Sequence, residues 1–155
     1  MLSIIAGLRP LKYFMDTEMY IFMIDSYENI FDVEPTFWII NQFNQILFDG
    51  NIQTFFLIYA IIGISIKIFA ISNISLYPLF SMFTYFCLYF ILYDMTAIRA
   101  SVAIGFFLWA IPDILNKNLK YYLFKMILAI SFHYSALIMV FLYFINPNKI
   151  NRNHY

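Results

Sequence analysis

Two opposite charges stand alone in a long apolar stretch of the sequence. Asp94 and Arg99 are the only formally charged residues between Ile68 and Pro112. A charged side chain among apolar neighbours is costly unless it pairs or binds a ligand. On one helix the two would lie about 140° apart, which places them poorly for neutralising each other. We therefore expect Arg99 to meet a partner from another element or a ligand, unless it simply extends to the lipid headgroups.

His133 is the only histidine within an apolar run, and it has two interpretations. It is either a hydrogen-bonded packing residue or a group that transfers protons. Ala129 and Ala136 flank it on the same helical face, which indicates that it points into the bundle. Its expected depth below the outer membrane surface is about 18 Å, against about 8 Å for Arg99, so direct contact between them needs a tilted helix.

A line of small residues runs beside Arg99. Ala97, Ser101 and Gly105 recur at every fourth position. Such a line lets a second helix approach closely. We expect this seam to serve packing alone, and the packing would hold Arg99 in a fixed position.

The composition indicates an integral membrane protein. Of the 155 residues, 63% are hydrophobic and only 12% are charged, whereas soluble domains carry about 25% charged residues. Apolar runs long enough to cross a bilayer recur along the chain. The formal net charge is zero, so no basic surface for nucleic acid is expected. The sequence shows no glycine-rich phosphate loop and no His/Cys cluster at metal-ligand spacing, so we expect no cofactor and no metal.

The apolar runs predict an all-α fold, a polytopic transmembrane helical bundle with about four spanning helices between residues 53 and 145. The stretch from 74 to 111 has almost no break, and as one helix it would extend about 57 Å, nearly twice the bilayer core of about 30 Å. It must therefore fold back, and Asp94 is the expected turning point and helix N-cap. The predicted helices are 53–71, 76–93, 95–111 and 121–145.

The N-terminal part of the chain is more polar and predicts a different kind of element. Residues 1–9 are interpreted as the end of a truncated helix, and residues 16–48 as an outward-facing amphipathic acidic segment. Its acidic face contains Glu18, Asp25, Glu28 and Asp32, and its apolar face contains Tyr20, Met23, Ile24, Tyr27 and Phe31. The acidic face is either solvated or a site for a divalent ion. With a polar tail at 146–155, the chain forms a single membrane domain.

Basic residues predict how these helices are oriented. Lys67, Lys117, Lys120 and Lys125 fall near ends of predicted helices, which the positive-inside rule places in the cytoplasm. The acidic segment, Asp94 and the start of the following helix then face outward. Lys149 and Arg152 would also lie outside, which counts against this scheme.

Three motifs resemble a known family. GLRPLKYFMDTEMY, YDMTAIRASVAIGFFLWAI and ILAISFHYSALIMV resemble the EpsG family of bacterial polysaccharide polymerases in order and spacing. Ala100 departs from the family pattern, because a glutamine usually follows that arginine. The resemblance covers only the middle of a longer protein, which predicts that the chain is a fragment.

The resemblance implies polymerisation of oligosaccharide repeat units carried on a polyprenyl diphosphate, in exopolysaccharide, capsule or O-antigen biosynthesis. The implied location is the bacterial cytoplasmic (inner) membrane, with the lipid-linked oligosaccharide, the bilayer and other membrane proteins of polysaccharide assembly as partners. Negative charge develops on the leaving diphosphate, whose oxygens a guanidinium can bind through paired hydrogen bonds. The implied substrate-binding residues are therefore Arg9 and Arg99. The implied catalytic residues are Arg99, with His133 or Asp16 as the base.

Two other functions fit the sequence. A transporter or flippase of lipid-linked sugars could place Arg99 in its pathway, although we find no internal repeat of the kind common in transporters. A non-catalytic subunit or an inactive membrane-protein remnant would use none of these side chains for chemistry. Flux of the lipid without bond formation would favour the transporter.

Overall fold

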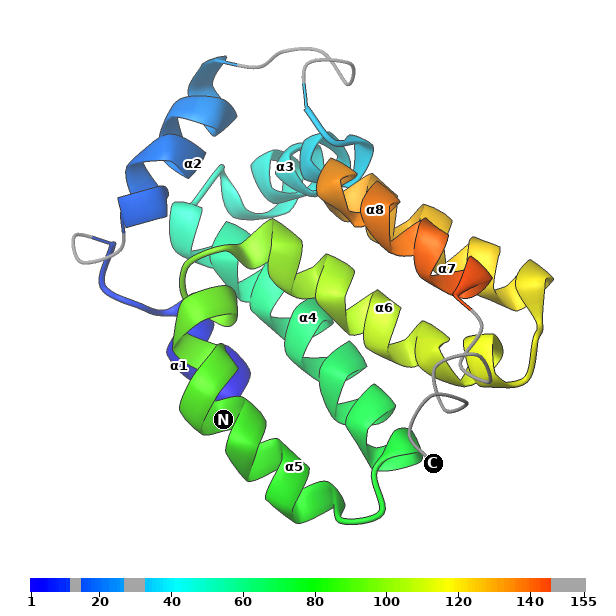
Figure 1. The fold of residues 1–155 in the computed structure, drawn as a ribbon. Helices are drawn as coiled ribbons and strands as arrows, with labels where there is room; N and C mark the ends of the chain where they lie inside the picture. The colour runs from blue at the N-terminus through cyan, green and yellow to red at the C-terminus, as the bar shows by residue number, and fades with distance from the viewer. Residues whose placement is uncertain (12–14, 27–32, 146–155) are drawn as a thin grey trace, which may run out of the picture.

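A computed structural model describes residues 1–11, 15–26 and 33–145 (Figure 1). The helices are α1 (Leu2–Gly7), α2 (Met15–Ser26), α3 (Pro35–Phe48), α4 (Ile52–Ile74), α5 (Pro78–Tyr85) with the π-helix η2 (Phe86–Asp94), α6 (Ile98–Leu115), α7 (Leu119–Phe132), the 3₁₀ turn η3 (Tyr134–Ala136), α8 (Leu137–Val140) and the 3₁₀ turn η4 (Phe141–Phe144). No β-strand occurs in these described ranges. The predicted all-α fold is therefore confirmed.

Helices α4 and α6 lie side by side at the centre of the molecule (Figure 1). Helices α1 and α5 lie on one flank of this pair, and α7 and α8 on the other. Two glycines permit the close approach. A Cβ on Gly105 would lie 3.2 Å from Ile66 Cγ2, and one on Gly63 would lie 3.3 Å from Ser101 Oγ. The predicted small-residue seam is therefore confirmed at Ser101 and Gly105, which pack against α4.

An aromatic core joins α3, α4 and the end of α7. The ring of Phe37 on α3 lies 5.2 Å from that of Phe55 on α4, centroid to centroid. The ring of Tyr59, one turn further along α4, lies 6.1 Å from that of Phe132 at the end of α7. All but Phe132 are at most 1% exposed. Burial of such large rings fixes the three elements against one another, and this sets where α3 begins and where α7 ends.

The turn between α3 and α4 is fixed by side-chain hydrogen bonds. Asp49 and Gly50 adopt left-handed backbone conformations, with φ of 51° and 70°. Asn51 then caps α4 by accepting a hydrogen bond from the Gln53 amide at 2.9 Å. Asn44 on α3 donates to the Asn51 carbonyl at 3.1 Å, so both helices leave the turn in a defined direction.

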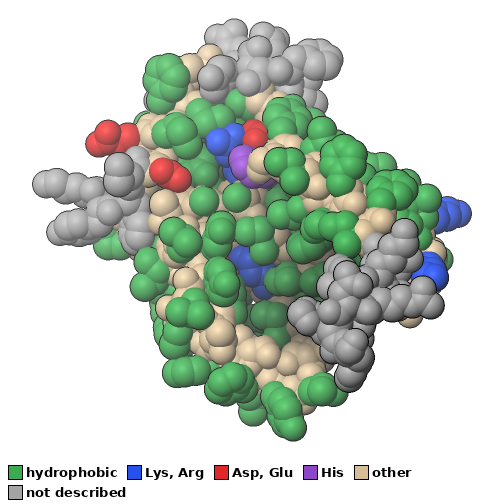
Figure 2. Space-filling model, viewed as in Figure 1, with side chains coloured by type: hydrophobic (Ala, Val, Ile, Leu, Met, Phe, Trp, Pro, Cys, Tyr) green, Lys and Arg blue, Asp and Glu red, His purple; other side chains and the backbone are tan. Residues whose placement is uncertain are grey.

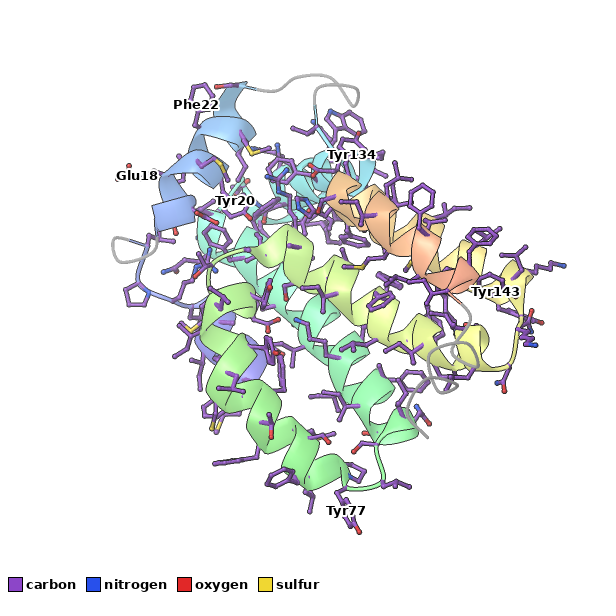
Figure 3. All side chains as sticks on the ribbon, in the orientation of Figure 1. Glu18, Tyr20, Phe22, Tyr77, Tyr134 and Tyr143 are labelled. Atoms are coloured by element: carbon purple, nitrogen blue, oxygen red, sulfur yellow. The ribbon has the colours of Figure 1, made fainter. Side chains whose placement is uncertain are left out.

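Helix α2 has one inward and one outward side (Figure 3). Tyr20 and Met23 are buried against the core, as predicted for the apolar face, whereas Glu18 is exposed. Phe22 is 64% exposed and points away from the other helices. It is an apolar residue that does not belong to the predicted apolar face. Ile24 is half-buried. Tyr27, Glu28, Phe31 and Asp32, the side chain of Asp25 and the tail at 146–155 lie outside what the structure describes.

In the part of the chain that the structure describes, two helices are long and apolar enough to cross a bilayer, α4 and α6. Two further apolar segments, Pro78–Asp94 and Tyr134–Phe144, are shorter. The number of about four spanning helices therefore stays a prediction. The chain does turn near Asp94, as expected, but α6 begins at Ile98, and Ala97 rather than Asp94 is its N-cap.

The prediction of one helix over 121–145 is wrong. Helix α7 ends at Phe132, and His133 is extended, with φ −157° and ψ 116°. The chain then folds back, and α8 packs against α7. The Tyr122 hydroxyl of α7 donates to the Met139 carbonyl of α8 at 2.5 Å. The local sequence marks this reversal only weakly, because Phe132 and Tyr134 flank His133 and the segment contains neither Gly nor Pro.

Candidate active site

Arg99 meets its partner on a distant element, as its isolation in the sequence predicts. Its guanidinium forms an ion pair with the carboxylate of Glu34, the N-cap residue of α3. The side chains are only 13% and 6% exposed. The other carboxylate oxygen, Glu34 Oε1, lies 3.1 Å from His133 Nδ1. One carboxylate therefore bridges Arg99 and His133, which we call the Arg–Glu–His cluster.

Arg99 and His133 meet through Glu34, and the structure gives no direct contact between their described side chains. The predicted depth of His133 is nevertheless wrong, because it assumes a straight helix over 121–145. Because α7 ends at Phe132, His133 instead lies at the break, level with the start of α3. The alternative in which Arg99 merely reaches toward the headgroups is not what the structure shows, since Glu34 holds the guanidinium.

Two side-chain hydrogen bonds tie the start of α3 to this break. The Thr36 hydroxyl donates to the Ser131 carbonyl at 2.6 Å. The Tyr134 hydroxyl donates to the Val33 carbonyl at 3.0 Å. The bonds lie on both sides of Glu34 in sequence, so they fix its carboxylate relative to the His133 ring.

Aromatic rings surround the Arg99 guanidinium. Its Cζ lies 5.4 Å from the ring centroid of Tyr20 and 5.5 Å from that of Phe37, within the range of cation–π attraction. Burial raises the pKa of the Tyr20 phenol, although the nearby Arg99 guanidinium acts to lower it. Among the described residues, Arg99 Nε has no hydrogen-bond acceptor. The guanidinium thus retains donor capacity beyond its pair with Glu34.

The cluster is accessible from one face of the molecule. Figure 2 shows acidic, basic and histidine side chains gathered in a hollow bordered by apolar side chains. The His133 side chain is 31% exposed, far more than its partner Glu34. A ligand can therefore approach the imidazole from outside while the carboxylate stays buried.

Arg9 follows α1 and lies elsewhere. It is 1% exposed, with Nη1 3.5 Å from the Asp94 carbonyl oxygen and Cζ 3.9 Å from the Phe56 ring centroid. Burial lowers its pKa to about 10, while Tyr20 and Asp16 act in the opposite direction, so it is charged at neutral pH. The Phe56 and Tyr20 rings are 5.9 Å apart. The two arginines therefore contact neighbouring rings rather than a shared carboxylate.

Asp16 lies in the first turn of α2. It is close enough to Arg9 and Tyr20 to influence their charge states. The structure gives no hydrogen bond between Asp16 and the Arg–Glu–His cluster among the described side chains. Of the two predicted bases, His133 is the one that shares a partner with Arg99 among the described side chains.

Glu34 is the site residue that the sequence reasoning missed. The pair Glu34–Pro35 is a signal for a helix start, because proline is favoured at the first helical position. That signal could have placed Glu34 at the end of an element. It could not have indicated Arg99 or His133 as the partners, which lie 65 and 99 residues away along the chain.

A second charged cluster lies deeper in the molecule. Lys67 Nζ is 2.6 Å from Asp94 Oδ1 and also contacts the Ser101 hydroxyl. Ser101 Oγ lies 2.5 Å from the same Asp94 oxygen, and the Tyr85 hydroxyl donates to the other one. The Lys67 and Asp94 side chains are 2% and 1% exposed. We call these four residues the Lys–Asp cluster.

The Lys–Asp cluster corrects two predictions. Asp94 does not cap α6, because its carboxylate is occupied by Lys67, Tyr85 and Ser101. Lys67 does not mark a cytoplasmic helix end, because it is buried within α4, seven residues before Ile74. The predicted orientation of the helices therefore rests on Lys117, Lys120 and Lys125.

These features define the class of protein. It is an all-helical membrane protein with a cation–carboxylate–histidine cluster between helix ends. The family model of the EpsG family matches residues 1–155, so the chain belongs to the EpsG family. No curated protein and no solved structure matches it. Membership in the family is consistent with a role in polysaccharide biosynthesis.

Proposed function

We propose that the protein takes part in polymerising lipid-linked oligosaccharide repeat units, by glycosyl transfer from a polyprenyl diphosphate donor. The proposed setting is the outer side of the bacterial cytoplasmic membrane, with a multi-pass topology. The observation that carries this proposal is the bridging of Arg99 and His133 by Glu34. It joins an anion-binding group and a proton acceptor in one accessible hollow.

Arg99 is the proposed binding group for the diphosphate. In the reaction the bond between the sugar C1 and the diphosphate oxygen breaks, and the leaving group departs with the electron pair. A fixed guanidinium stabilises this developing negative charge, and most strongly where water is excluded. Glu34 binds one terminal nitrogen, Nη1, and the buried Nε is out of reach of a ligand. The terminal N–H groups that Glu34 leaves unused suit two phosphate oxygens in the fork geometry of arginine.

His133 is the proposed base. With its Nδ1–H donated to Glu34, the imidazole presents a lone pair at Nε2, because a neutral histidine has one protonated nitrogen. Nε2 would accept the proton of the acceptor hydroxyl as its oxygen bonds to C1. Glu34 acts as a positioning residue, since it selects the tautomer and stabilises the imidazolium that forms.

Arg9 and Asp16 have supporting roles in this proposal. Arg9 is charged and packs on the Phe56 ring, which lies 5.9 Å from the Tyr20 ring that contacts Arg99, so it adds positive potential near the diphosphate. Asp16 is the second candidate base and influences Arg9 directly. Either role predicts a smaller effect on substitution than those of Arg99 and His133.

The test is a polymerisation assay in membrane vesicles supplied with a lipid-linked repeat unit. Arg99→Lys keeps the charge but loses the fork, and we expect a fall in rate of roughly 10²- to 10³-fold, the usual effect of removing a transition-state donor. The matched control is Lys125→Gln, which breaks another half-buried pair, Lys125–Asp113, away from the cluster. Polymer of normal length and rate from Arg99→Lys would exclude the bidentate role. Lipid flux without any glycosidic bond would indicate a transporter instead.

A further inference from the structure

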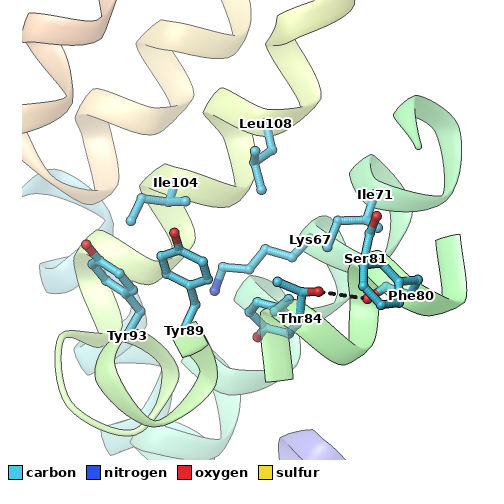
Figure 4. A pocket seen from close by; sticks show the side chains of 10 residues that line it. Lys67, Ile71, Phe80, Ser81, Thr84, Tyr89, Tyr93, Ile104 and Leu108 are labelled. Atoms are coloured by element: carbon cyan, nitrogen blue, oxygen red, sulfur yellow. Dashed lines mark hydrogen bonds between the residues drawn. The ribbon is translucent and has the colours of Figure 1, made fainter. Parts of the chain in front are cut away.

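A separate cavity of about 440 Å³ lies between α4, the α5–η2 segment and α6 (Figure 4). Its volume is within the range of ligand pockets, about 300–1,000 Å³. Lys67 reaches across it from α4, Tyr89 and Tyr93 border it from η2, and Ile104 and Leu108 close it from α6. None of these last four residues belongs to either charged cluster.

The structure gives no hydrogen bond to a described residue for the Tyr89 and Tyr93 hydroxyls, but the other polar groups in the wall bind protein partners. Lys67 and Tyr85 bind the Asp94 carboxylate. The Thr84 hydroxyl donates to a carbonyl of its own helix at 3.0 Å, and Ser81 Oγ lies 2.7 Å from a neighbouring serine hydroxyl. A ligand that entered would find mainly aliphatic and aromatic surface. The cavity therefore suits a hydrocarbon chain rather than a phosphate or a sugar.

The bordering segment is irregular where the cavity lies. Residues of η2 form backbone bonds five residues apart, such as the Met95 amide to the Phe90 carbonyl at 3.2 Å. Such π-helical stretches are rare and often occur at functional sites. On the outer side of α5, Leu79 and Phe83 are 85% and 64% exposed, as expected for side chains that face lipid. An apolar chain that lies beside α5 in the lipid is therefore next to the segment that borders the cavity.

Helix α6 connects the cavity to the Arg–Glu–His cluster. Ile104 and Leu108 follow Arg99 by five and nine residues, which places them about 8 and 14 Å further along the helix axis. They face away from Arg99, so a chain must cross the helix between the two sites. Ala100 lies between Arg99 and Ile104 around the helix, and its methyl side chain takes up little space where a lipid chain would cross. Figure 2 shows two hollows on the same face, each with a basic side chain in it.

We propose that this cavity binds the isoprenoid chain of the lipid carrier, at the units nearest the diphosphate. This inference rests on the proposed function, since it takes the donor to be a polyprenyl diphosphate held at Arg99. One molecule then lies with its diphosphate at the Arg–Glu–His cluster and its chain across Ala100. The cavity sets the preference for a long chain, whereas the cluster carries out the transfer.

The first experiment compares donors that carry the same sugar on a one-isoprene chain, too short to reach the cavity, or on a long polyprenyl chain. Leu108→Trp and Ile104→Trp fill the cavity, and Leu115→Trp, at an exposed position of the same helix, is the control. We expect the KM for the long-chain donor to rise about tenfold, the loss of one or two buried methylenes. The kcat and the KM for the short-chain donor should stay unchanged. An equal effect on both donors, or none, would overturn the proposal.

The second experiment does not depend on turnover. A polyprenyl diphosphate with a photoreactive group on its second isoprene unit is irradiated with the wild-type protein, and labelled peptides are mapped. We expect label within residues 80–93 or 104–108, reduced by unlabelled polyprenyl diphosphate but not by a diacyl phospholipid. Label elsewhere, or equal competition by the phospholipid, would contradict the cavity. Correct labelling in a protein that makes no polymer would contradict the proposed function alone.

Discussion

The two charged clusters use the same chemical types in different ways. Each pairs a cation with a carboxylate from a distant segment, Arg99 with Glu34 and Lys67 with Asp94. In the Lys–Asp cluster the carboxylate accepts from three side chains, and both charges are almost fully buried. In the Arg–Glu–His cluster a guanidinium nitrogen lacks an acceptor among the described residues, and the histidine is partly exposed.

This difference separates a structural pair from a reactive one. A buried ion pair with all its hydrogen bonds made has nothing left to offer a ligand, and its removal leaves an uncompensated charge. An incompletely satisfied pair at an opening can exchange part of its bonding for a substrate. The comparison predicts that one cluster controls stability and the other controls turnover.

The largest expected effect is on catalysis by His133. His133→Gln keeps a polar side chain but removes the base, so we expect kcat to fall roughly 10²- to 10⁴-fold. Binding of the donor, measured with the photoreactive lipid, should change little because Arg99 remains. Glu34→Gln should lower kcat as well, since the carboxylate no longer orients the imidazole. Normal chain elongation by His133→Gln would leave this histidine as packing only.

The second-largest expected effect is on stability, through the Lys–Asp cluster. Lys67→Met leaves Asp94 buried without its cation, and we expect the free energy of unfolding to fall by about 3–5 kcal/mol. The double variant Lys67→Met with Asp94→Asn removes both charges and should recover most of that loss. The measurement is denaturant-induced unfolding in mixed micelles. A well-folded double variant that makes no polymer would show that the Lys–Asp cluster is not purely structural.

A smaller effect is expected at the contact between α4 and α6. Gly105→Val adds side-chain atoms where even a Cβ would lie 3.2 Å from Ile66, so we expect a loss of about 1–3 kcal/mol in stability. The same unfolding assay measures it. Gly105→Ala should have a milder effect. If Gly105→Val unfolds like the wild type, the two helices are not packed as closely as described.

The smallest effect tests how Glu34 and His133 are aligned. Thr36→Val removes the hydrogen bond to the Ser131 carbonyl, and we expect a loss of about 1 kcal/mol in stability. A modest fall in kcat with an unchanged KM should accompany it, because the His133 ring is less well fixed. Thr36→Ser retains the hydroxyl and should restore both values. A loss of stability with no change in kcat would limit Thr36 to a structural role.

Much of the site was visible in the sequence as isolated residues. Arg99 stands out because a lone cation in an apolar run needs a partner, and the structure provides one. His133 stands out for a similar reason, but an unbroken helix predicts the wrong neighbours for it. Asp94 marks a turning point, yet its carboxylate binds Lys67 in another helix rather than its own backbone. Local sequence patterns do not indicate which distant residues these side chains bind.

The class of the fold follows from the amino-acid sequence alone. Long apolar runs with few charges form helices in lipid, because each backbone group is then bonded within its own segment. The position of Glu34 between Arg99 and His133, and the reversal of the chain after Phe132, follow from packing between distant segments. These depend on contacts between residues 65 to 101 positions apart, such as the Tyr134 hydroxyl with the Val33 carbonyl. Helix periodicity reaches only a few residues along the chain, so it carries no information about them.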